Sequence, residues 1–533
     1  MSLTQDGSAG GGTYANGRRI QGMVIGDSFN GTWASSKDDG WFTFTMSPDC
    51  ATFDGTWGQR DVVVGEPWTG RRVTSVEALP PPMVEELASG LRVPWSLGFG
   101  QNGDIWVTQQ PCLLTVLRSE PVSLTVPGCV DVGDGVRGLQ LDPASPGACD
   151  SAVYLVYTHR RSEGDLATRV GRFRLDCTDG LRLADEQVLL GGVPGADIHT
   201  AGRLKFGPDG NLYLATGDAL NTSLSQNPDS LGGKILRFNT DGSVPSDNPT
   251  PGSYVYSLGH RNPQGLAWQP STGDLWITDH GPSPTIAGEP FVCCHDEINR
   301  IVPGGNYGWP IVAGAIADPR FVSPALESGL GTWAPSGAAF YRGSAVAQWD
   351  GSLLFGTLIG QHLGRVTFAS PAFTTVATHE QLLNGAFGRL REVVEGPDGY
   401  LYLTTSNIDG RSGAQARTGD DRVLRIVAVP SLTERQAVVR AAYLSTLGRE
   451  ADGEGLIFWT YTHHPASTLA ATMSAAAEGE RVAAVRALYR ELLDRDPIVG
   501  DRPGLRYWVD MGQPVERIRD GMFTSEEYRS KHG

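Results

Sequence analysis

The sequence of 533 residues has little positive charge. Lys and Arg together number 43 against 59 Asp and Glu, which gives a formal net charge of −16 at pH 7. Nucleic acids and anionic membranes attract basic surfaces, so this balance argues against both as partners. The sequence also lacks an apolar run of the roughly 18 residues that a transmembrane helix needs. We therefore expect no nucleic-acid partner and no transmembrane segment.

Cysteine motifs for metal binding are missing as well. The seven cysteines include no CxxC pair, and no Cys/His cluster has the spacing of a zinc site. The odd number leaves at least one thiol free or paired with another chain. Residues 1–6 lack the basic and apolar regions of a signal peptide, so no export signal is visible. Four cysteines of one region could form disulfides in an oxidising compartment or could be inert buried thiols: Cys112, Cys129, Cys149 and Cys177.

Glycine and proline, in contrast, are abundant, at 69 and 34 residues, which is typical of a chain with many turns and short strands. Near the N-terminus the phrase FNGTW (29–33) recurs as FDGTW (53–57), with the alternating segment WFTFT (41–45) between them. Aromatic residues alternating with Thr and bounded by Gly or Asp predict antiparallel hairpins. We interpret residues 1–76 as a small β accessory domain.

A longer repeat occupies residues 77–430. Each copy is a tight turn with Gly where a positive φ is needed, followed by a strand of aromatic and branched residues. Weaker copies lie at 139–157 and 348–357, which makes about six units spaced roughly 40 to 80 residues apart, as a six-bladed β-propeller requires. The clear copies are Gly100–Thr108, Gly207–Thr216, Pro270–Thr278 and Gly396–Thr404.

Residues 431–533 change to helical periodicity, so the predicted fold is mainly β with a C-terminal α-helical domain. The segment RAAYLSTLGR (440–449), followed by Trp459, recurs as RALYRELLDR (486–495), followed by Trp508. This pattern resembles the bacterial DUF4214 module, which is often repeated in large exported proteins. We expect a structural or interaction role here, with protein or glycan contacts through both terminal domains.

The loop Ser257–Leu266 (SLGHRNPQGL) concentrates a His, a cation and two amides just before an apolar strand expected from Leu266 to Thr278. It could be a surface loop whose side chains satisfy local backbone groups. Elsewhere, His199 precedes an expected inner strand, and Arg389 and Arg391 share one face of an extended segment. Because equivalent ends of inner strands converge in a propeller, these residues predict a site for a polyanionic ligand.

Four motifs, HRNPQGL (260–266), IHTAGRLKFGPDGNLY (198–213), DEINRIVPGGNYGWP (296–310) and GRLREVVEGPDG (388–399), resemble the soluble glucose/sorbosone (aldose sugar) dehydrogenases that depend on pyrroloquinoline quinone (PQQ). The similarity spans about 84–427. It implies that His199 is the general base that takes a proton from the substrate hydroxyl while hydride passes to the quinone. The residues that match those around the quinone and its carboxylates are Arg261, Asn262, Gln264, Arg389 and Arg391.

The resemblance also implies a metal ion and a substrate contact. Gly281 and Pro282 match the pair whose main-chain carbonyls bind Ca²⁺, which would polarise the quinone carbonyl. Asp296 lies where the family often has an acidic residue near the substrate. The expected partners are a sugar and an electron acceptor that the sequence does not identify. The resemblance also implies a location in the periplasm or outside the cell, which is typical of this family.

Two departures from the family pattern bear on the cofactor. Gly133 takes the place of a Gln or Glu, and Ile359 stands where a lysine contacts the quinone. An insertion between Pro282 and Asp296, which carries Cys293–Cys294, could narrow the channel mouth or change the choice of substrate. A non-catalytic binding propeller that has lost its cofactor is therefore the alternative hypothesis. A Ca²⁺-dependent lactonase on a six-bladed propeller would need a converging cluster of carboxylates, and no such cluster stands out.

Overall fold

The computed structural model describes two compact units, Met1–Leu79 and Pro80–Gly533, each considered by itself. In the first unit it describes the strand backbones. In the second it describes residues 82–132, 135–283, 286, 289–291, 293–409, 419–428, 432–449, most of 451–497 and isolated positions beyond.

The first unit is a seven-stranded antiparallel sheet in which each strand pairs with the next along the chain. The two copies of the repeated phrase form β4 and β6 on either side of β5, so the predicted hairpins are present. The assignment of this unit as an accessory domain stays a prediction. The strands are β1 Ser2–Asp6, β2 Ala9–Tyr14, β3 Arg18–Ile25, β4 Ser28–Ala34, β5 Asp39–Met46, β6 Thr52–Gln59 and β7 Glu66–Arg71.

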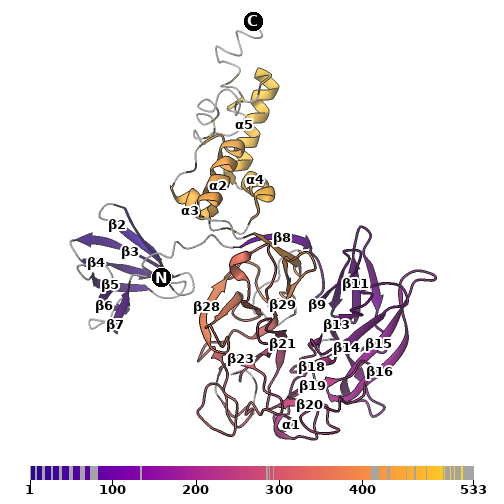
Figure 1. Ribbon diagram of the computed structural model, residues 1–533. Helices are drawn as coiled ribbons and strands as arrows, with labels where there is room; N and C mark the ends of the chain where they lie inside the picture. Colours follow the sequence, from indigo (N-terminus) through magenta and orange to yellow (C-terminus); the bar gives the residue numbers. More distant parts are fainter. Residues whose placement is uncertain are drawn as a thin grey trace. The chain divides into compact units, whose positions relative to one another are not determined.

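The second unit contains six four-stranded antiparallel sheets, which confirms the predicted six-bladed propeller. Figure 1 shows β9, β13, β21 and β29 toward the centre of the ring and β16 and β28 toward its outside. In chain order the blades are β9 Pro94–Phe99, β10 Ile105–Gln109, β11 Leu113–Leu117, β12 Val122–Thr125; β13 Val136–Leu141, β14 Ala152–Arg160, β15 Leu166–Asp176, β16 Arg182–Pro194; β17 Leu204–Phe206, β18 Leu212–Thr216, β19 Lys234–Phe238, β20 Val255–Leu258; β21 Pro263–Trp268, β22 Leu275–Asp279, β23 Glu297–Arg300, β24 Leu326–Glu327; β25 Pro335–Phe340, β26 Leu353–Thr357, β27 Leu363–Phe368, β28 Val376–Leu382; and β29 Leu390–Glu395, β30 Leu401–Thr405, β31 Val423–Ala428 with β8 Met83–Ala88.

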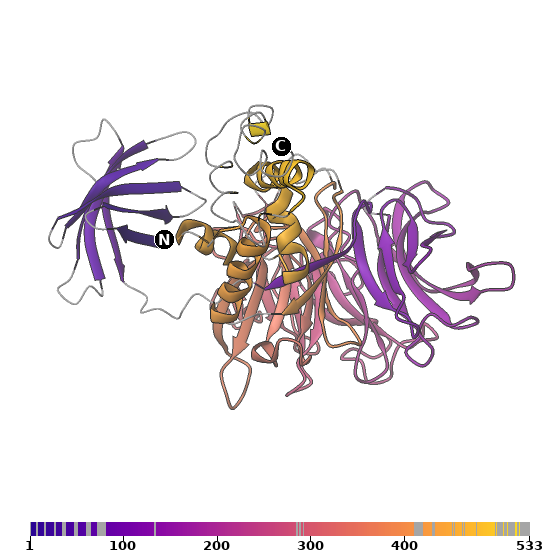
Figure 2. The same ribbon diagram turned by 90° about the horizontal axis from the view of Figure 1, so that it is seen from above.

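The ring closes through its first strand. β8 pairs antiparallel with β31, so the start of the propeller supplies the outermost strand of the last blade. Figure 2 shows β8, in indigo, among the brown strands of that blade. Because this pairing joins two segments far apart in the sequence, it locks the ring without a covalent link. Apolar side chains of neighbouring sheets, such as Leu214 and Val156, fill the spaces between blades.

The repeated turns connect the first and second strands of their blades. In the copy at Gly207, the backbone N–H of Gly207 donates to the carbonyl of Asn211 at 2.8 Å, and Gly210 has a φ of 78°. A Cβ on Gly210 would meet no atom within 4 Å, so the left-handed backbone and not a lack of space requires glycine there. The turn repeat thus predicts the blades correctly.

One strand differs from its prediction. The expected strand Leu266–Thr278 is a hairpin of two strands, β21 and β22, and β21 already begins at Pro263. Proline is tolerated there because β21 is the inner edge strand of its blade and Pro263 is the strand's first residue. The loop proper is therefore only residues 259–262.

Disulfides and helices complete the second unit. Cys112 pairs with Cys129 and Cys149 with Cys177, while Cys293 and Cys294 form a disulfide between sequence neighbours. Cys50 lies outside the described residues. No described helix is long and apolar enough to cross a bilayer. The described part of the chain after residue 431 forms helices, as predicted, although its resemblance to DUF4214 stays a prediction. The helices are α1 Ser223–Gln226, α2 Leu432–Thr446, α3 Gly453–Thr460, α4 Ala466–Ala475 and α5 Ala477–Leu493.

Candidate active site

The predicted site residues lie at one end of the inner strands. In an antiparallel hairpin, the residue just before the first strand lies beside the residue just after the second. Three blades use this geometry to bring a basic group to a carboxylate. The pairs are His199 with Asp218, His260 with Asp279, and Arg389 with Asp409.

His199 is buried and fixed by a carboxylate that the sequence did not single out. Its Nδ1 lies 3.0 Å from Oδ1 of Asp218, and Oδ2 of Asp218 accepts the indole N–H of Trp309 at 2.9 Å. A carboxylate oxygen only accepts, so Nδ1 carries the proton and Nε2 is left as an acceptor. His199 has a φ of 57°, a conformation that is common at functional sites. Gly217 is required beside it, because a Cβ there would lie 2.0 Å from the His199 carbonyl oxygen.

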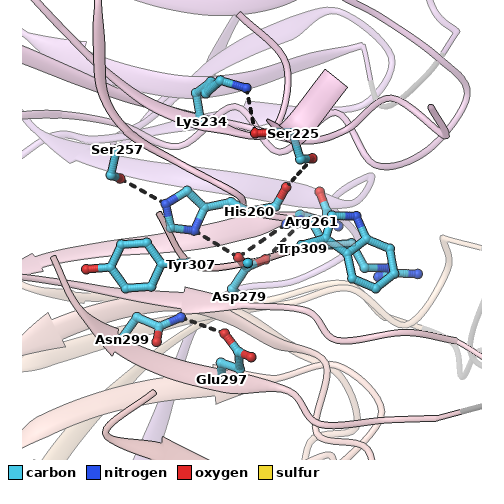
Figure 3. Close-up of polar contacts among 12 residues, drawn as sticks. Ser225, Lys234, Ser257, His260, Arg261, Asp279, Glu297, Asn299, Tyr307 and Trp309 are labelled. Atoms are coloured by element: carbon cyan, nitrogen blue, oxygen red, sulfur yellow. Dashed lines mark hydrogen bonds and ion pairs between the residues drawn. The ribbon is translucent and has the colours of Figure 1, made fainter. Parts of the chain in front are cut away.

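The loop 259–262 is held by a buried Ser–His–Asp chain, shown in Figure 3. Oγ of Ser257 lies 2.9 Å from Nε2 of His260, whose Nδ1 lies 3.1 Å from Oδ2 of Asp279. Ser257 and His260 have no exposed surface, so no substrate reaches them and this chain is not a nucleophilic triad. Asp279 instead accepts the backbone N–H groups of Arg261 and Asn262, at 3.3 and 2.8 Å. The His260–Asp279 pair therefore positions the loop.

Two of the predicted arginines share one carboxylate. Arg389 and Arg391 both donate to Oδ2 of Asp409, at 2.7 and 3.1 Å, and all three side chains are almost fully buried. Nη1 of Arg391 also lies 3.3 Å from Oε1 of Gln264. The structure thus brings Gln264 and both arginines together, as the sequence predicts.

The third arginine, Arg261, pairs with a carboxylate from the segment between Pro282 and Asp296. Its Nε and Nη2 lie 2.7 and 2.6 Å from Oε1 of Glu289. Its guanidinium lies over the ring of Trp309, 5.6 Å from the centroid. Sequence reasoning noted the insertion but not Glu289.

Unpartnered buried polar atoms lie among these cations. Nε2 of His280 and Oγ1 of Thr200 are buried and form no hydrogen bond with the described part of the chain. Burial, followed by the charges of Arg261, His199 and Arg391, lowers the pKa of His280 well below its ordinary value. His280 therefore adds a neutral imidazole to the site, and an unmet hydrogen-bonding capacity favours a bound polar ligand.

Both carboxylate oxygens of Asp296 accept hydrogen bonds from the protein itself. Its two oxygens accept the backbone N–H groups of Gly281, Trp333 and Ala334 and the hydroxyl of Thr332, at 2.6–2.9 Å. Burial raises its pKa. These contacts tie Gly281 to the next blade, and they leave the predicted contact of Asp296 with substrate untested.

No cluster of three or more His, Cys, Asp or Glu that could hold a metal ion occurs among the residues that the structure describes. A metal at Gly281 and Pro282 would therefore depend on main-chain carbonyls. Ile359 is 47% exposed, and its backbone N–H donates to the Trp333 carbonyl. Gly133 lies outside the described residues.

An open cavity of about 570 Å³ is lined by Asp197 and Ala219, which are close in sequence to the His199–Asp218 pair. The Ala219 N–H donates to the His199 carbonyl, but the His199 side chain does not line the cavity.

Glu297 gives this region a pH-dependent stability. Burial, then the negative charge of Asp279, raises the pKa of Glu297 to about 8 from an ordinary value near 4.5. The folded state therefore binds more protons than the unfolded state between these values, so stability should fall as pH rises through that range, by at most about 1.4 kcal/mol per pH unit. We expect Glu297→Gln to remove this slope. Urea unfolding between pH 5 and 8 would measure it, with Glu380→Gln, at an exposed carboxylate, as control; parallel curves for wild type and Glu297→Gln would contradict it.

The comparisons with known proteins identify the family of this chain. The model of the glucose/sorbosone dehydrogenase family matches residues 91–414. Aldose sugar dehydrogenase YliI of Escherichia coli K12 is 31% identical over 350 residues, which cover 61% of this chain and 91% of that protein.

Solved structures show the same relationship. The PQQ-bound aldose sugar dehydrogenase of Streptomyces coelicolor is 35% identical, with a TM-score of 0.56, over 65% of this chain and 98% of that one. A glucose dehydrogenase structure from Thermus thermophilus is 42% identical, with a TM-score of 0.57, over 64% of this chain and 99% of that one. This chain therefore belongs to the glucose/sorbosone dehydrogenase family.

Proposed function

We propose that this protein is a quinoprotein dehydrogenase that oxidises a hydroxyl of an aldose or a related sugar, with PQQ as cofactor. Membership of the family supports a sugar oxidoreductase. The observation that carries the mechanism is the His199–Asp218 pair beside a buried group of arginines.

His199 is the general base in this proposal. Asp218 fixes the tautomer in which Nε2 accepts, and no hydrogen bond to Nε2 is formed by the residues that the structure describes. Nε2 then takes the proton of the substrate hydroxyl as the C–H bond beside it gives up hydride. Asp218, held in turn by Trp309, stabilises the imidazolium that forms.

The described residues fit an anionic, hydrogen-bonding cofactor. Arg261, Arg389 and Arg391 supply charge, and His280 and Thr200 supply buried polar atoms that form no hydrogen bond with any described residue. A tricarboxylated quinone matches both properties. Asn262 and Gln264 complete the set expected to hold it. When bound, such a quinone accepts hydride, with Ca²⁺ on the carbonyls of Gly281 and Pro282 as Lewis acid.

We assign Asp296 a positioning role, because the hydrogen bonds it accepts hold Gly281 in place. The terminal regions 1–76 and 431–533 are proposed as accessory interaction domains flanking the propeller 77–430. The Cys112–Cys129 and Cys149–Cys177 disulfides support a periplasmic or extracellular location, since such bonds persist in oxidising compartments. The electron acceptor is not identified.

Reconstitution tests the proposal. The purified chain is titrated with PQQ and Ca²⁺, and quinone absorbance is followed as aldoses are added. We expect saturable binding and sugar-dependent reduction. Absence of binding at micromolar PQQ would contradict the proposal. It would favour the second candidate, a binding propeller, which the Glu289–Arg261 pair and the exposed Ile359 support because both weaken an anion site.

A further inference from the structure

The pair Arg261–Glu289 is unusual for a site that is to receive an anion. Both side chains are only 4% exposed, and Oε1 of Glu289 lies within 2.7 Å of both Nε and Nη2 of Arg261. Oε2 of Glu289 accepts the backbone N–H of Ser283 at 2.7 Å. One carboxylate oxygen of Glu289 therefore lies against the Nε–Nη2 edge of the guanidinium, which is an edge that a ligand carboxylate would use.

The net charge of the site depends strongly on Glu289. Arg389 and Arg391 both pair with Asp409, and Arg261 pairs with Glu289. These five groups together carry one net positive charge. Loss of the Glu289 charge would double it.

We propose that Glu289 is an internal anion that competes with an anionic cofactor for Arg261 and thereby sets the affinity of the site. This inference rests on the proposed function. A ligand carboxylate that binds the Nε–Nη2 edge of Arg261 must displace Glu289, which then leaves a buried partner and must be resolvated. The segment between Pro282 and Asp296, which the family resemblance identifies as an insertion, thus tunes cofactor retention.

The test compares Glu289→Gln with the wild type in the intact chain. PQQ binding is measured with Ca²⁺ present, by calorimetry or by quenching of tryptophan fluorescence. The variant keeps the size of the side chain but loses its charge, so we expect the Kd to fall about tenfold, which is the scale of one charge-assisted hydrogen bond. Glu380→Gln removes the same charge at an exposed pair with Arg365 and should leave the Kd unchanged.

Unchanged or weaker PQQ binding in a folded Glu289→Gln would overturn the inference. If that variant does not fold, Glu289→Asp, which withdraws the carboxylate by one methylene, should give an intermediate tightening, and its absence would count equally against competition.

A second probe separates this inference from the proposed function. Benzene-1,3,5-tricarboxylate is a plain anion, and its stabilisation of the protein against heat can be measured without PQQ. Stronger stabilisation of Glu289→Gln than of the wild type would support the competition even if neither protein binds PQQ, in which case only the proposed function fails. Equal stabilisation together with equal PQQ affinity would overturn the competition alone.

Discussion

Replacing His199 by alanine is expected to lower kcat by about 10²- to 10⁴-fold, the usual contribution of a positioned base. KM should change little, because proton transfer develops in the transition state and not in the bound substrate. The physical basis is the proton on Nδ1, held by Asp218 at 3.0 Å, which leaves Nε2 to accept. Steady-state kinetics of the reconstituted enzyme, with aldose varied at saturating PQQ, would measure the split.

The matched variant for this prediction is Asp218→Asn. An amide at that position can donate as well as accept, so it no longer fixes the tautomer of His199. We expect a smaller loss of kcat than in His199→Ala and a displaced pH profile. Wild-type kcat in His199→Ala, with PQQ bound normally, would assign the proton transfer to another group.

The second large effect is on stability. Arg203 forms an ion pair with Glu392, and both side chains are at most 2% exposed. Arg203 also donates to Ser96 and to the Gln264 carbonyl, and its guanidinium lies 4.1 Å from the ring centroid of Trp95. Burial lowers the pKa of Arg203, and the charge of Glu392 opposes that shift. The pair therefore links inner strands of several blades around a buried cation whose charge Glu392 balances.

Glu392→Gln should reduce the free energy of unfolding by about 3–5 kcal/mol, because it leaves a buried cation uncompensated. Lys205 adds to the effect, since Glu392 also opposes the burial that lowers its pKa to about 8. Urea unfolding of the intact chain would measure the loss. Glu380→Gln, which breaks an exposed pair, should cost at most about 1 kcal/mol. Similar losses in the two variants would show that Arg203 finds another partner.

These two effects have different origins in the fold. In the proposed mechanism His199 acts on a reacting group at the end of a hairpin, so its loss should leave the propeller intact. Glu392 lies on β29 within the ring, where several inner strands meet, so its loss should weaken the whole unit. Measuring kcat and the free energy of unfolding for both variants would therefore distinguish a loss of catalysis from a loss of stability.

Much of the fold could be predicted from the sequence, because its determinants are local. A turn such as Gly207–Asn211 needs a left-handed residue at Gly210, and the apolar and aromatic residues that follow form a strand buried on both faces. Six repetitions of such a unit define a propeller. The motifs around His199 and Arg261 could likewise be placed at the starts of inner strands, since each lies directly before an apolar strand.

Only the tertiary structure shows which carboxylates pair with the basic residues of the site. Asp218, Asp409 and Glu289 lie 18 to 28 residues from the His and Arg side chains with which they pair, and polar residues at such separations are too common to pair by inspection. The geometry of an antiparallel hairpin could have indicated Asp218 and Asp409, because residues that follow the second strand lie near residues that precede the first. Nothing comparable indicated Glu289, whose position depends on the path of a non-repetitive segment. Local backbone requirements therefore determined the scaffold, whereas the charge balance of the site depends on long-range packing.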